Sequence, residues 1–355
     1  MGKSIVLTGG GTAGHVTPNL ALLPGLKARG FEIRYIGSYN GMEKGIIEGA
    51  GIEYHGISTG KFRRNLSLKN VTDVGRVVKG LGEAKKLLSE IKPDIVFSKG
   101  GFVSVPVVRA AKSLGIPVIL HESDMTPGLA NKLCYNAAIK CCCNFPETLQ
   151  YLPEGKGVLS GSPMREDLFT GSREAGLKFC GFDGSKPVLL KIGGSLGATH
   201  LSQLLEEALD DLLPEFDIIN LCGRGNLNEA LVGRPGYVQF EYITEELKDL
   251  YACADIIYSR AGANVLCELL ALKKPNLLVP LGRSVSRGDQ ILNAESFKKQ
   301  GFSMVIEEEV LNKDNLAQAL RELYQTREKY VKAMEESKLG NGVDVILGLI
   351  DEVVK

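Results

Sequence analysis

The sequence predicts an α/β protein with two Rossmann-like domains, each built on a mostly parallel sheet. Short apolar runs alternate with amphipathic segments along the chain, as in βαβ units. The 355 residues suffice for two domains of ordinary size. A strand, a glycine-rich turn and a helix open each half, first at Gly9 and again at Gly193. Two such halves predict a cleft between the domains as the ligand site.

Composition narrows the function classes. The chain is 44% hydrophobic and 24% charged, with a formal net charge of zero, so nothing indicates nucleic acid as a partner. Tryptophan is absent and aromatic residues make up only 6%, which disfavours stacking platforms for bases. The uncharged stretch 4–26 is interrupted by glycine and proline, so it predicts neither a signal peptide nor a membrane span. We therefore expect a cytoplasmic protein.

The cysteine pattern gives no sign of a metal or redox site. The eight cysteines include no C-x-x-C pair. Three of them, Cys141, Cys142 and Cys143, are consecutive. This run predicts part of a buried strand in a reduced compartment, and a free reactive thiol is the less favoured alternative.

The first half predicts a sheet whose loops form the candidate site. The expected strands are 4–8, 32–36, 53–57, 94–98, 117–120, 139–142 and 157–159, and the expected helices include 18–29, 42–50, 67–91, 105–114 and 129–136. Ligands of open parallel sheets bind beyond the carboxyl ends of the strands. The loops that follow the strands are therefore where we look for function.

The loop after the first strand has the form of an anion-binding turn. Gly9, Gly11 and Gly14 fit the spacing G-x-G-x-x-G, and the next helix offers its N-terminal N–H groups to an anion. His15 directly follows the last glycine, where an imidazole would face the bound group. A glycine turn with a hydrogen-bonded structural histidine is the alternative for this stretch.

Two further loops of the first half carry glycine or titratable side chains. Gly100 and Gly101 follow the fourth expected strand, and His121, Glu122 and Asp124 follow the fifth. A carboxylate near a histidine orients the ring and raises its pKa, which suits general-base catalysis on a hydroxyl. A structural cap ahead of the next Pro-Gly turn is the alternative for the His-Glu pair.

The segment from Lys61 to Lys86 is basic and amphipathic. It contains eight Lys and Arg residues against two acidic ones, with apolar residues interleaved. Such a surface can rest on anionic lipid headgroups. A solvated helix face of the ordinary kind is the alternative.

The second half repeats the pattern of the first. A break at 161–163 predicts domains of residues 1–162 and 163–340, with a last helix, 343–355, packing back on the first domain. The expected strands are 186–192, 216–221, 237–240 and 255–258, and the expected helices include 199–213, 245–253 (with Thr244 as its N-cap) and 311–338.

The second half also has the chemistry for a nucleotide sugar. The loop 259–264 opens a helix, and such a loop can hold a diphosphate through N–H groups and the helix dipole without a metal. Glu268 follows in that helix, where a carboxylate can accept both hydroxyls of a ribose. A surface glutamate that complements the helix dipole is the alternative. Asp289, Gln290 and Asn293 are placed to hydrogen-bond a polyhydroxylated ligand.

The ordered set of motifs resembles the MurG-type N-acetylglucosaminyltransferases of glycosyltransferase family 28 over essentially the whole chain. The resemblance lies in the glycine loops 10–15, 99–104 and 193–198, in Ser259-Arg260-Ala261-Gly262-Ala263 with Glu268, and in Asp289-Gln290 with Asn293-Ala294. It implies a GT-B fold, in which two Rossmann-like domains face a cleft.

The resemblance also implies the reaction. Such enzymes are inverting hexosyltransferases that move N-acetylglucosamine from UDP-N-acetylglucosamine to the C4 hydroxyl of undecaprenyl-diphosphate-linked N-acetylmuramoyl-pentapeptide. The product is the peptidoglycan precursor lipid II, made from lipid I on the cytoplasmic face of the cell membrane. No metal and no cofactor is implied, because loops and helix dipoles hold the diphosphate. The segment from Lys61 to Lys86 would then contact an anionic membrane surface.

Site residues follow from the same likeness. The implied donor-binding residues are Arg165, Ser195, Ala263 and Asn264 for the diphosphate, Ile243 for uracil, Glu268 for ribose, Gln290 and Asn293 for the sugar, and Arg260 within the signature. The implied acceptor residues are Gly10, Gly11, Thr12, Gly14, His15, Gly100, Gly101 and Asp124. His15 is the first candidate for the catalytic base, and Glu122 is the second.

Some features leave alternatives open. Asp124 stands where the family usually has Asn, and Val265 stands where Thr is common. Relatives of this fold glycosylate diacylglycerol, so another lipid acceptor is one alternative and a UDP-sugar epimerase is a second. A dinucleotide-dependent oxidoreductase would carry an acidic residue at the end of the second strand, where Ile36-Gly37-Ser38 stand. A non-catalytic scaffold would need no ribose-binding Glu268 beside a phosphate loop.

Overall fold

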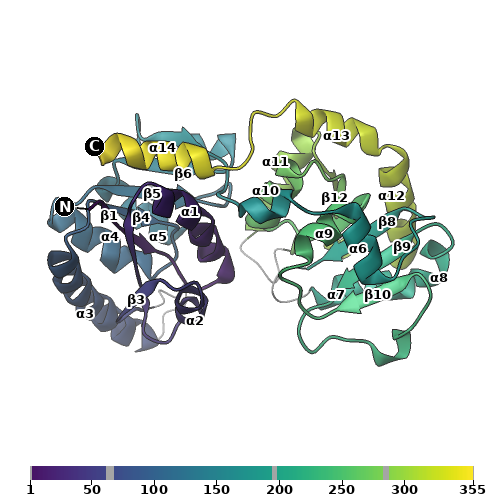
Figure 1. Cartoon of the computed structure of the whole chain (residues 1–355), viewed down its shortest axis with the longest axis horizontal. Coiled ribbons are helices and arrows are strands. Elements are labelled where there is room, and N and C mark those ends of the chain that lie inside the picture. The colour runs from purple at the N-terminus through teal and green to yellow at the C-terminus, as the bar shows by residue number, and fades with distance from the viewer. Residues whose placement is uncertain (1, 61–67, 194–197, 283–287, 355) are drawn as a thin grey trace. The chain divides into compact units, whose positions relative to one another are not determined.

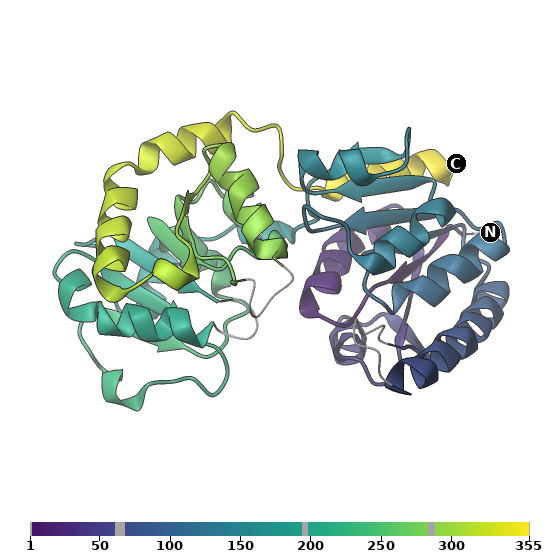
Figure 2. The ribbon, with the colours of Figure 1, turned by 180° about the vertical axis from the view of Figure 1, so that it is seen from behind.

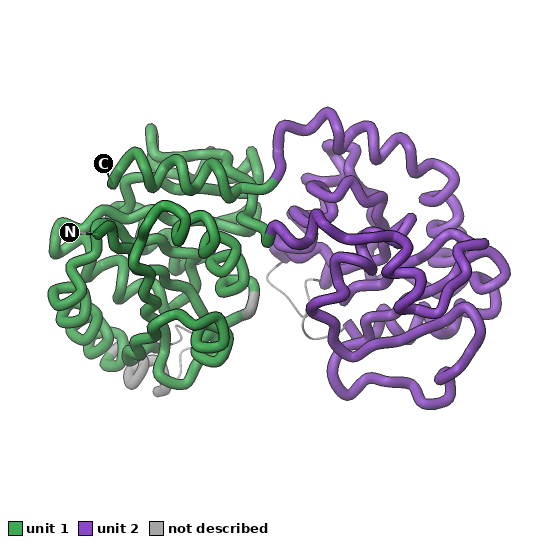
Figure 3. Tube along the Cα trace, viewed as in Figure 1, with its two compact units in different colours: residues 1–165, 341–355 green, residues 166–340 purple. Residues whose placement is uncertain are grey.

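The chain forms two compact α/β units. The computed structural model describes residues 2–60, 68–193, 198–282 and 288–354 (Figure 1). One unit consists of residues 1–165 and 341–355, and the other consists of residues 166–340 (Figure 3). The first unit thus ends its main segment at Arg165, whereas the sequence analysis placed the boundary at Ser162.

Unit 1 contains a seven-stranded parallel sheet in the order β3-β2-β1-β4-β5-β6-β7. Its strands are β1 Ser4–Thr8, β2 Glu32–Ser38, β3 Glu53–Ile57, β4 Ile95–Ser98, β5 Val118–Glu122, β6 Lys140–Cys143 and β7 Gly157–Leu159. Its helices are α1 Thr17–Ala28, α2 Met42–Gly49, α3 Leu68–Ile91, α4 Ser104–Ser113, α5 Leu129–Cys134 and α14 Val343–Val353, with 3-10 helices at Ala13–His15, Tyr135–Ala137 and Pro146–Tyr151.

Unit 2 contains a six-stranded parallel sheet in the order β10-β9-β8-β11-β12-β13. Its strands are β8 Val188–Ile192, β9 Asp217–Leu221, β10 Tyr237–Phe240, β11 Ile256–Ser259, β12 Asn276–Leu278 and β13 Met304–Val305. Its helices are α6 Arg173–Cys180, α7 Thr199–Glu207, α8 Leu209–Leu212, α9 Leu247–Cys253, α10 Ala263–Ala271, α11 Asp289–Lys299, α12 Lys313–Gln325 and α13 Arg327–Glu335, with 3-10 helices at Glu166–Phe169, Glu229–Leu231 and Glu308–Val310.

The two sheets share one topology, and it locates the candidate sites. In each unit the first strand lies between the second and the fourth, so the strand order reverses between β1 and β4 and between β8 and β11. Doubly wound sheets bind ligands outside the carboxyl ends of the strands at this switch point. The loops after these four strands are the glycine or nucleotide-sugar motifs singled out in the sequence.

The alternation of side chains along β1 explains how both faces of the unit 1 sheet are covered. Ile5 and Leu7 pack into a core with residues of α1 and α14, whereas Val6 packs on the other face with residues of α3 and α4. The opposite views in Figure 1 and Figure 2 show these helix pairs on the two sides of the sheet. The C-terminal helix α14 therefore completes the core of unit 1, and Arg29 pairs with Asp351 beside it at 2.8 Å.

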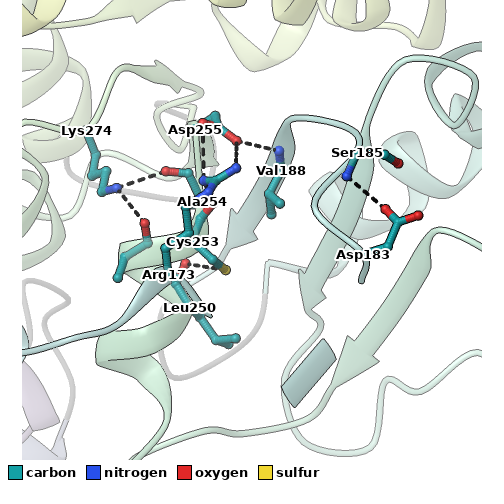
Figure 4. Close-up of polar contacts among 10 residues, drawn as sticks. Arg173, Asp183, Ser185, Val188, Leu250, Cys253, Ala254, Asp255 and Lys274 are labelled. Carbon is teal, nitrogen blue, oxygen red and sulfur yellow. Dashed lines mark hydrogen bonds and ion pairs between the residues drawn. The ribbon is translucent and has the colours of Figure 1, made fainter. Parts of the chain in front are cut away.

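An aspartate fixes the amino ends of the two central strands in each unit. Asp94, just before β4, accepts a hydrogen bond from the Ser4 backbone N–H of β1 at 2.7 Å. Asp255, just before β11, accepts one from the Val188 backbone N–H of β8 at 2.8 Å, and Arg173 pairs with the same carboxylate (Figure 4). Both aspartates lie at the amino edge of their sheet, opposite the candidate ligand loops. They therefore stabilise the scaffold without occupying the carboxyl edge.

The predicted α/β class and two-unit organisation agree with the structure, and all eleven expected strands are present within a few residues. The cysteine run lies in β6 as expected, and all eight cysteines are buried thiols outside any disulfide within the described residues. Burial raises the pKa of Cys141 to about 11 and that of Cys142 to about 12, so these thiols stay protonated at neutral pH.

Several boundary predictions were wrong. Strand β5 continues through Glu122 because Glu122 pairs with Cys143 of β6, so the His-Glu pair ends a strand rather than following it. Helix α9 starts at Leu247 without a side-chain cap, so Thr244 is not its N-cap. The helices expected at 199–213 and 311–338 are each two helices, and the two-residue strand β13 has too few residues to be predicted.

No helix among the described residues is both long and apolar enough to cross a membrane.

Candidate functional site

The first two glycine loops pack directly on each other at the switch point of unit 1. A Cβ built on Gly101 would lie 2.3 Å from the Gly10 carbonyl oxygen and 3.3 Å from Cδ2 of His15. Gly101 also has a φ of +82°, which L side chains rarely adopt. Position 101 is therefore glycine because its backbone packs directly against the loop after β1 and against His15.

The side chains of Asn19 and Tyr35 hydrogen-bond to the backbone of the first glycine loop and its flanking residues. Asn19 Nδ2 donates to the carbonyl oxygens of Thr8 and His15, both at 3.4 Å, and to the Tyr35 hydroxyl at 3.2 Å. The Tyr35 hydroxyl donates in turn to the Gly9 carbonyl at 2.7 Å. His15 ends a short 3-10 helix on this support, so the network sets the position of the imidazole relative to the loop.

Sequence reasoning missed a buried carboxylate against the first loop. Glu43, near the start of α2, accepts hydrogen bonds from the backbone N–H and the hydroxyl of Ser38 at the end of β2. A Cβ on Gly10 would lie 2.8 Å from Glu43 Cδ, so any side chain at position 10 would displace the Glu43 carboxylate. The residue lies 33 positions from Gly10, so no local motif could have revealed the contact.

His121 is a structural residue in this fold. Its Nε2 lies 2.9 Å from the Gly161 carbonyl oxygen and must donate, so Nδ1 accepts from the Lys99 ammonium at 2.7 Å. Complete burial, followed by the nearby charge of Lys99, lowers the pKa of His121 well below its usual value. The ring is thus neutral and both nitrogens are occupied, while Lys99 also donates to Ser123 Oγ at 2.7 Å.

Glu122 organises the loop after β5. It accepts from the backbone N–H groups of Ser123, Asp124 and Gly128 and from Asn131 Nδ2, at 2.9 to 3.2 Å. Burial raises the pKa of Glu122, but four N–H donors now occupy the carboxylate oxygens. This geometry is the cap that the sequence analysis kept as the alternative. Asp124 lies in the same loop and is only partly buried.

In unit 2, Glu268 is held by a tyrosine from another helix. The Tyr251 hydroxyl of α9 donates to Glu268 Oε2 at 2.7 Å. Burial, reinforced by Glu268, raises the pKa of Tyr251 well above its usual value, so the hydroxyl keeps its proton and acts as the donor. Glu268 lies in the second turn of α10, whose first residues are Ala263 and Asn264. Ala263, Asn264 and Glu268 thus lie on the same helix, directly after β11.

Arg260 is engaged with a carboxylate that the sequence analysis did not single out. Its Nη2 donates to Glu308 Oε1, and its Nη1 donates to the carbonyl oxygens of Val279 and Pro280. His200, in the first turn of α7, donates from Nδ1 to the same Glu308 oxygen at 2.9 Å. The guanidinium therefore braces neighbouring loops in this structure.

The remaining predicted donor residues have varied surroundings. Asn293 is buried and donates from Nδ2 to the Ala261 carbonyl at 3.3 Å, and Gln290 accepts from the Leu281 backbone N–H at 3.0 Å. Ile243 is partly buried between β10 and α9, and Arg165 belongs to unit 1. Ser195 lies outside the described residues. In the described parts of the chain, no three His, Cys, Asp or Glu side chains gather as a metal site.

Comparison with family models decides the family. Residues 5–142 match the glycosyltransferase family 28 N-terminal domain, and residues 188–346 match the glycosyltransferase family 28 C-terminal domain. The chain belongs to glycosyltransferase family 28. The first match lies in unit 1, and the second lies in unit 2 except for residues 341–346, which belong to unit 1.

Relatives and solved structures agree with this assignment. A Lachnospira eligens protein is 60% identical over 350 residues, covers 99% of both chains, and is named UDP-N-acetylglucosamine--N-acetylmuramyl-(pentapeptide) pyrophosphoryl-undecaprenol N-acetylglucosamine transferase. A Clostridium tetani protein of the same name is 55% identical over 352 residues, 99% of this chain and 98% of its own. The crystal structure of Acinetobacter baumannii MurG superposes with a TM-score of 0.77 at 26% identity, covering 99% of each chain. The predicted family and GT-B fold are thereby confirmed.

Proposed function

We propose that this chain transfers N-acetylglucosamine from UDP-N-acetylglucosamine to the C4 hydroxyl of undecaprenyl-diphosphate-linked N-acetylmuramoyl-pentapeptide. The observation that supports this most strongly is the 60% identity, over 99% of both chains, to a relative named for that reaction. In the transfer, the acceptor hydroxyl forms a bond to the anomeric carbon while the bond from that carbon to the diphosphate breaks. UDP leaves, the hydroxyl proton passes to a base, and the configuration inverts.

Unit 2 would bind the donor. Helix α10 begins directly after the loop that follows β11, and its first N–H groups, at Ala263 and Asn264, are the proposed contacts to the diphosphate. Glu268 has one oxygen held by Tyr251, which orients the carboxylate for the ribose hydroxyls. Arg165, Ser195 and Ile243 remain proposed contacts to the diphosphate and uracil. Gln290 and Asn293, both on α11, are proposed contacts to the sugar hydroxyls, and Arg260 supports the surrounding loops through the contacts described above.

Unit 1 would bind the acceptor and supply the base. The loops containing Gly10, Gly11, Thr12 and Gly14, and Gly100 with Gly101, form the proposed diphosphate site, with Asp124 at its side. His15 is the better base because Glu122 has its oxygens occupied by four N–H donors. Glu122 then acts by holding the loop that carries Asp124.

A transfer assay tests the proposed function. Purified protein is given UDP-N-acetylglucosamine labelled in the sugar, with either the muramoyl-pentapeptide lipid diphosphate or diacylglycerol. Label that moves only to the first lipid supports the proposal, and label on diacylglycerol overturns the acceptor assignment. A labelled UDP-sugar of changed configuration, formed without lipid, would instead support an epimerase.

Replacing Tyr251 by phenylalanine is expected to weaken binding of UDP-N-acetylglucosamine about tenfold. The change removes only the hydroxyl that orients Glu268, and a hydrogen bond to a charged group contributes about 1.5 kcal/mol or more. Calorimetric titration measures the loss. Tyr258→Phe is the matched control, because the buried Tyr258 hydroxyl has no hydrogen-bond partner among the residues that the structure describes. Unchanged affinity in Tyr251→Phe would remove Glu268 from the donor site.

We infer that the chain works as a peripheral protein on the cytoplasmic membrane face. The first part of the basic segment, 61–67, lies outside the described residues. The remainder of the segment lies in α3. There Ala84 and Leu88 are buried, whereas Val78 is 65% exposed and Leu81 is 38% exposed. The basic residues Arg76, Lys79, Lys85 and Lys86 are exposed beside them. This mixture of apolar and basic side chains suits an anionic lipid surface.

Vesicle binding tests this attachment. The double variant Val78→Asp with Leu81→Asp is expected to bind vesicles containing phosphatidylglycerol about tenfold more weakly, since it loses apolar insertion and adds repulsion. Co-sedimentation measures the bound fraction. Val232→Asp, at an equally exposed (65%) valine of unit 2, is the control. Equal binding by the double variant and the wild type would exclude α3 as the attachment surface.

A further inference from the structure

Glu308 accepts hydrogen bonds from three separate segments at the carboxyl edge of the unit 2 sheet. Its Oε1 accepts from Nδ1 of His200 and from Nη2 of Arg260, and the carboxylate also accepts from the Gly282 backbone N–H. The three donors come from the first turn of α7, from the loop after β11 and from the loop after β12. Sequence separations of 108 and 48 residues to the two side chains make these purely tertiary contacts.

The fold delivers Glu308 to this position through β13. Strand β13 pairs in parallel with β12, and the Ile306 N–H continues the pairing with the Leu278 carbonyl at 3.0 Å. The 3-10 helix Glu308–Val310 follows at once, so Glu308 emerges at the edge where all the parallel strands end. Its side chain is only 18% exposed, whereas the flanking Glu307 and Glu309 are both exposed.

The Glu308 carboxylate is held by charge-assisted hydrogen bonds. Burial raises the pKa of Glu308, but hydrogen bonds from Arg260 and His200 outweigh it and hold the pKa below its usual value. The carboxylate is therefore ionised at neutral pH, and its bonds to Arg260 and His200 are charge-assisted. The charge of Arg260 offsets that of Glu308, so the pair adds no net negative charge near a proposed diphosphate site.

We propose that Glu308 is a positioning residue that sets the diphosphate and sugar subsites of the donor site relative to one another. The inference rests on the proposed function, in which the start of α10 holds the diphosphate and α11 contacts the sugar. Glu308 touches neither substrate in this account. It acts by fixing the start of α7, the segment that leads into α10 and the backbone after β12, through its bonds to His200, Arg260 and Gly282.

The test compares Glu308→Gln with Glu309→Gln, which makes the same charge change one residue away on an exposed side chain. Glu308→Gln is expected to raise the KM for UDP-N-acetylglucosamine and the Kd for UDP about tenfold, since it weakens two charge-assisted bonds. The KM for the lipid acceptor is expected to change less than about twofold. Glu309→Gln is expected to match the wild type in all three measurements.

A second variant guards against misfolding of the first. His200→Ala removes only the α7 contact and leaves the buried Arg260 paired with Glu308, because the His200 side chain is itself 49% exposed. It is expected to raise the Kd for UDP about threefold without lowering the melting temperature by more than about 2 °C. If Glu308→Gln fails to fold, this variant carries the test.

The outcomes separate the two proposals. Unchanged UDP binding in both variants, or an equal rise in the KM of donor and acceptor, overturns the positioning role while leaving the transferase assignment intact. If the wild-type protein binds UDP but transfers no sugar, the proposed function is wrong. Weaker UDP binding by the variants would then still support the positioning role of Glu308. A wild-type protein that does not bind UDP overturns both.

Discussion

Replacing His15 by alanine is expected to lower kcat by about 10²- to 10⁴-fold, the usual contribution of a general base. The affinity for UDP-N-acetylglucosamine should change less than about twofold, because the proposed donor residues of unit 2 are untouched. Steady-state transfer kinetics and calorimetric titration with the donor measure the two quantities. Added imidazole is expected to restore part of the rate by replacing the missing ring.

The sequence contains four histidines, and their surroundings single out His15. His121 is buried with both ring nitrogens engaged, and His200 binds Glu308 in unit 2. His55 lies on the edge strand β3 and pairs with Glu53 at 3.1 Å, which makes His55→Ala the matched control with wild-type activity expected.

The competing base candidate is tested in the same series. Glu122→Gln replaces a carboxylate that four N–H donors surround, so it should lower the melting temperature and alter both kinetic constants modestly. A large loss of kcat in Glu122→Gln, together with near-normal turnover in His15→Ala, would reverse the assignment of the base.

Local pattern was enough to predict the scaffold. The apolar run 4–8 matches strand β1 because a parallel strand that is buried on both faces needs an almost continuous apolar run, and the glycine turn that follows marks where the strand ends. The glycine loops could be placed at the carboxyl edge of the sheet because each directly follows a predicted strand, whereas the strand order that puts them at the switch points is known only from the structure. Boundary errors arose where tertiary pairing extends an element, as at Glu122 in β5.

The contacts that support the loops could not be predicted in the same way. Glu43 and Glu308 look in the sequence like ordinary surface glutamates on amphipathic or polar stretches. Their roles depend on which distant backbone they meet, Gly10 in one case and Gly282 in the other. A single sequence holds no local signal for such meetings, so the residues that orient a site are found only when the fold is known.

Replacing Gly101 by alanine is expected to reduce kcat/KM for the lipid acceptor by about 100-fold, the effect of displacing reacting groups by roughly 1 Å. Two costs combine at this position. The φ of +82° disfavours any L side chain by about 1–2 kcal/mol. A new Cβ would also lie 2.3 Å from the Gly10 carbonyl oxygen, far inside van der Waals contact, so the first glycine loop must move. His15 would move with that loop.

Gly115→Ala separates the two costs. Gly115 has a φ of +72° in the same unit, but nothing lies within 4 Å of a Cβ built there. It should therefore lose a similar amount of stability from the backbone term while keeping full activity. Thermal unfolding and transfer kinetics on both variants give the comparison, with donor affinity expected to stay unchanged in each. Full acceptor turnover in Gly101→Ala would mean that the two glycine loops need not pack this closely to bind the lipid diphosphate. The loss expected in that variant alone would instead connect the close approach at Gly10 to the placement of the base.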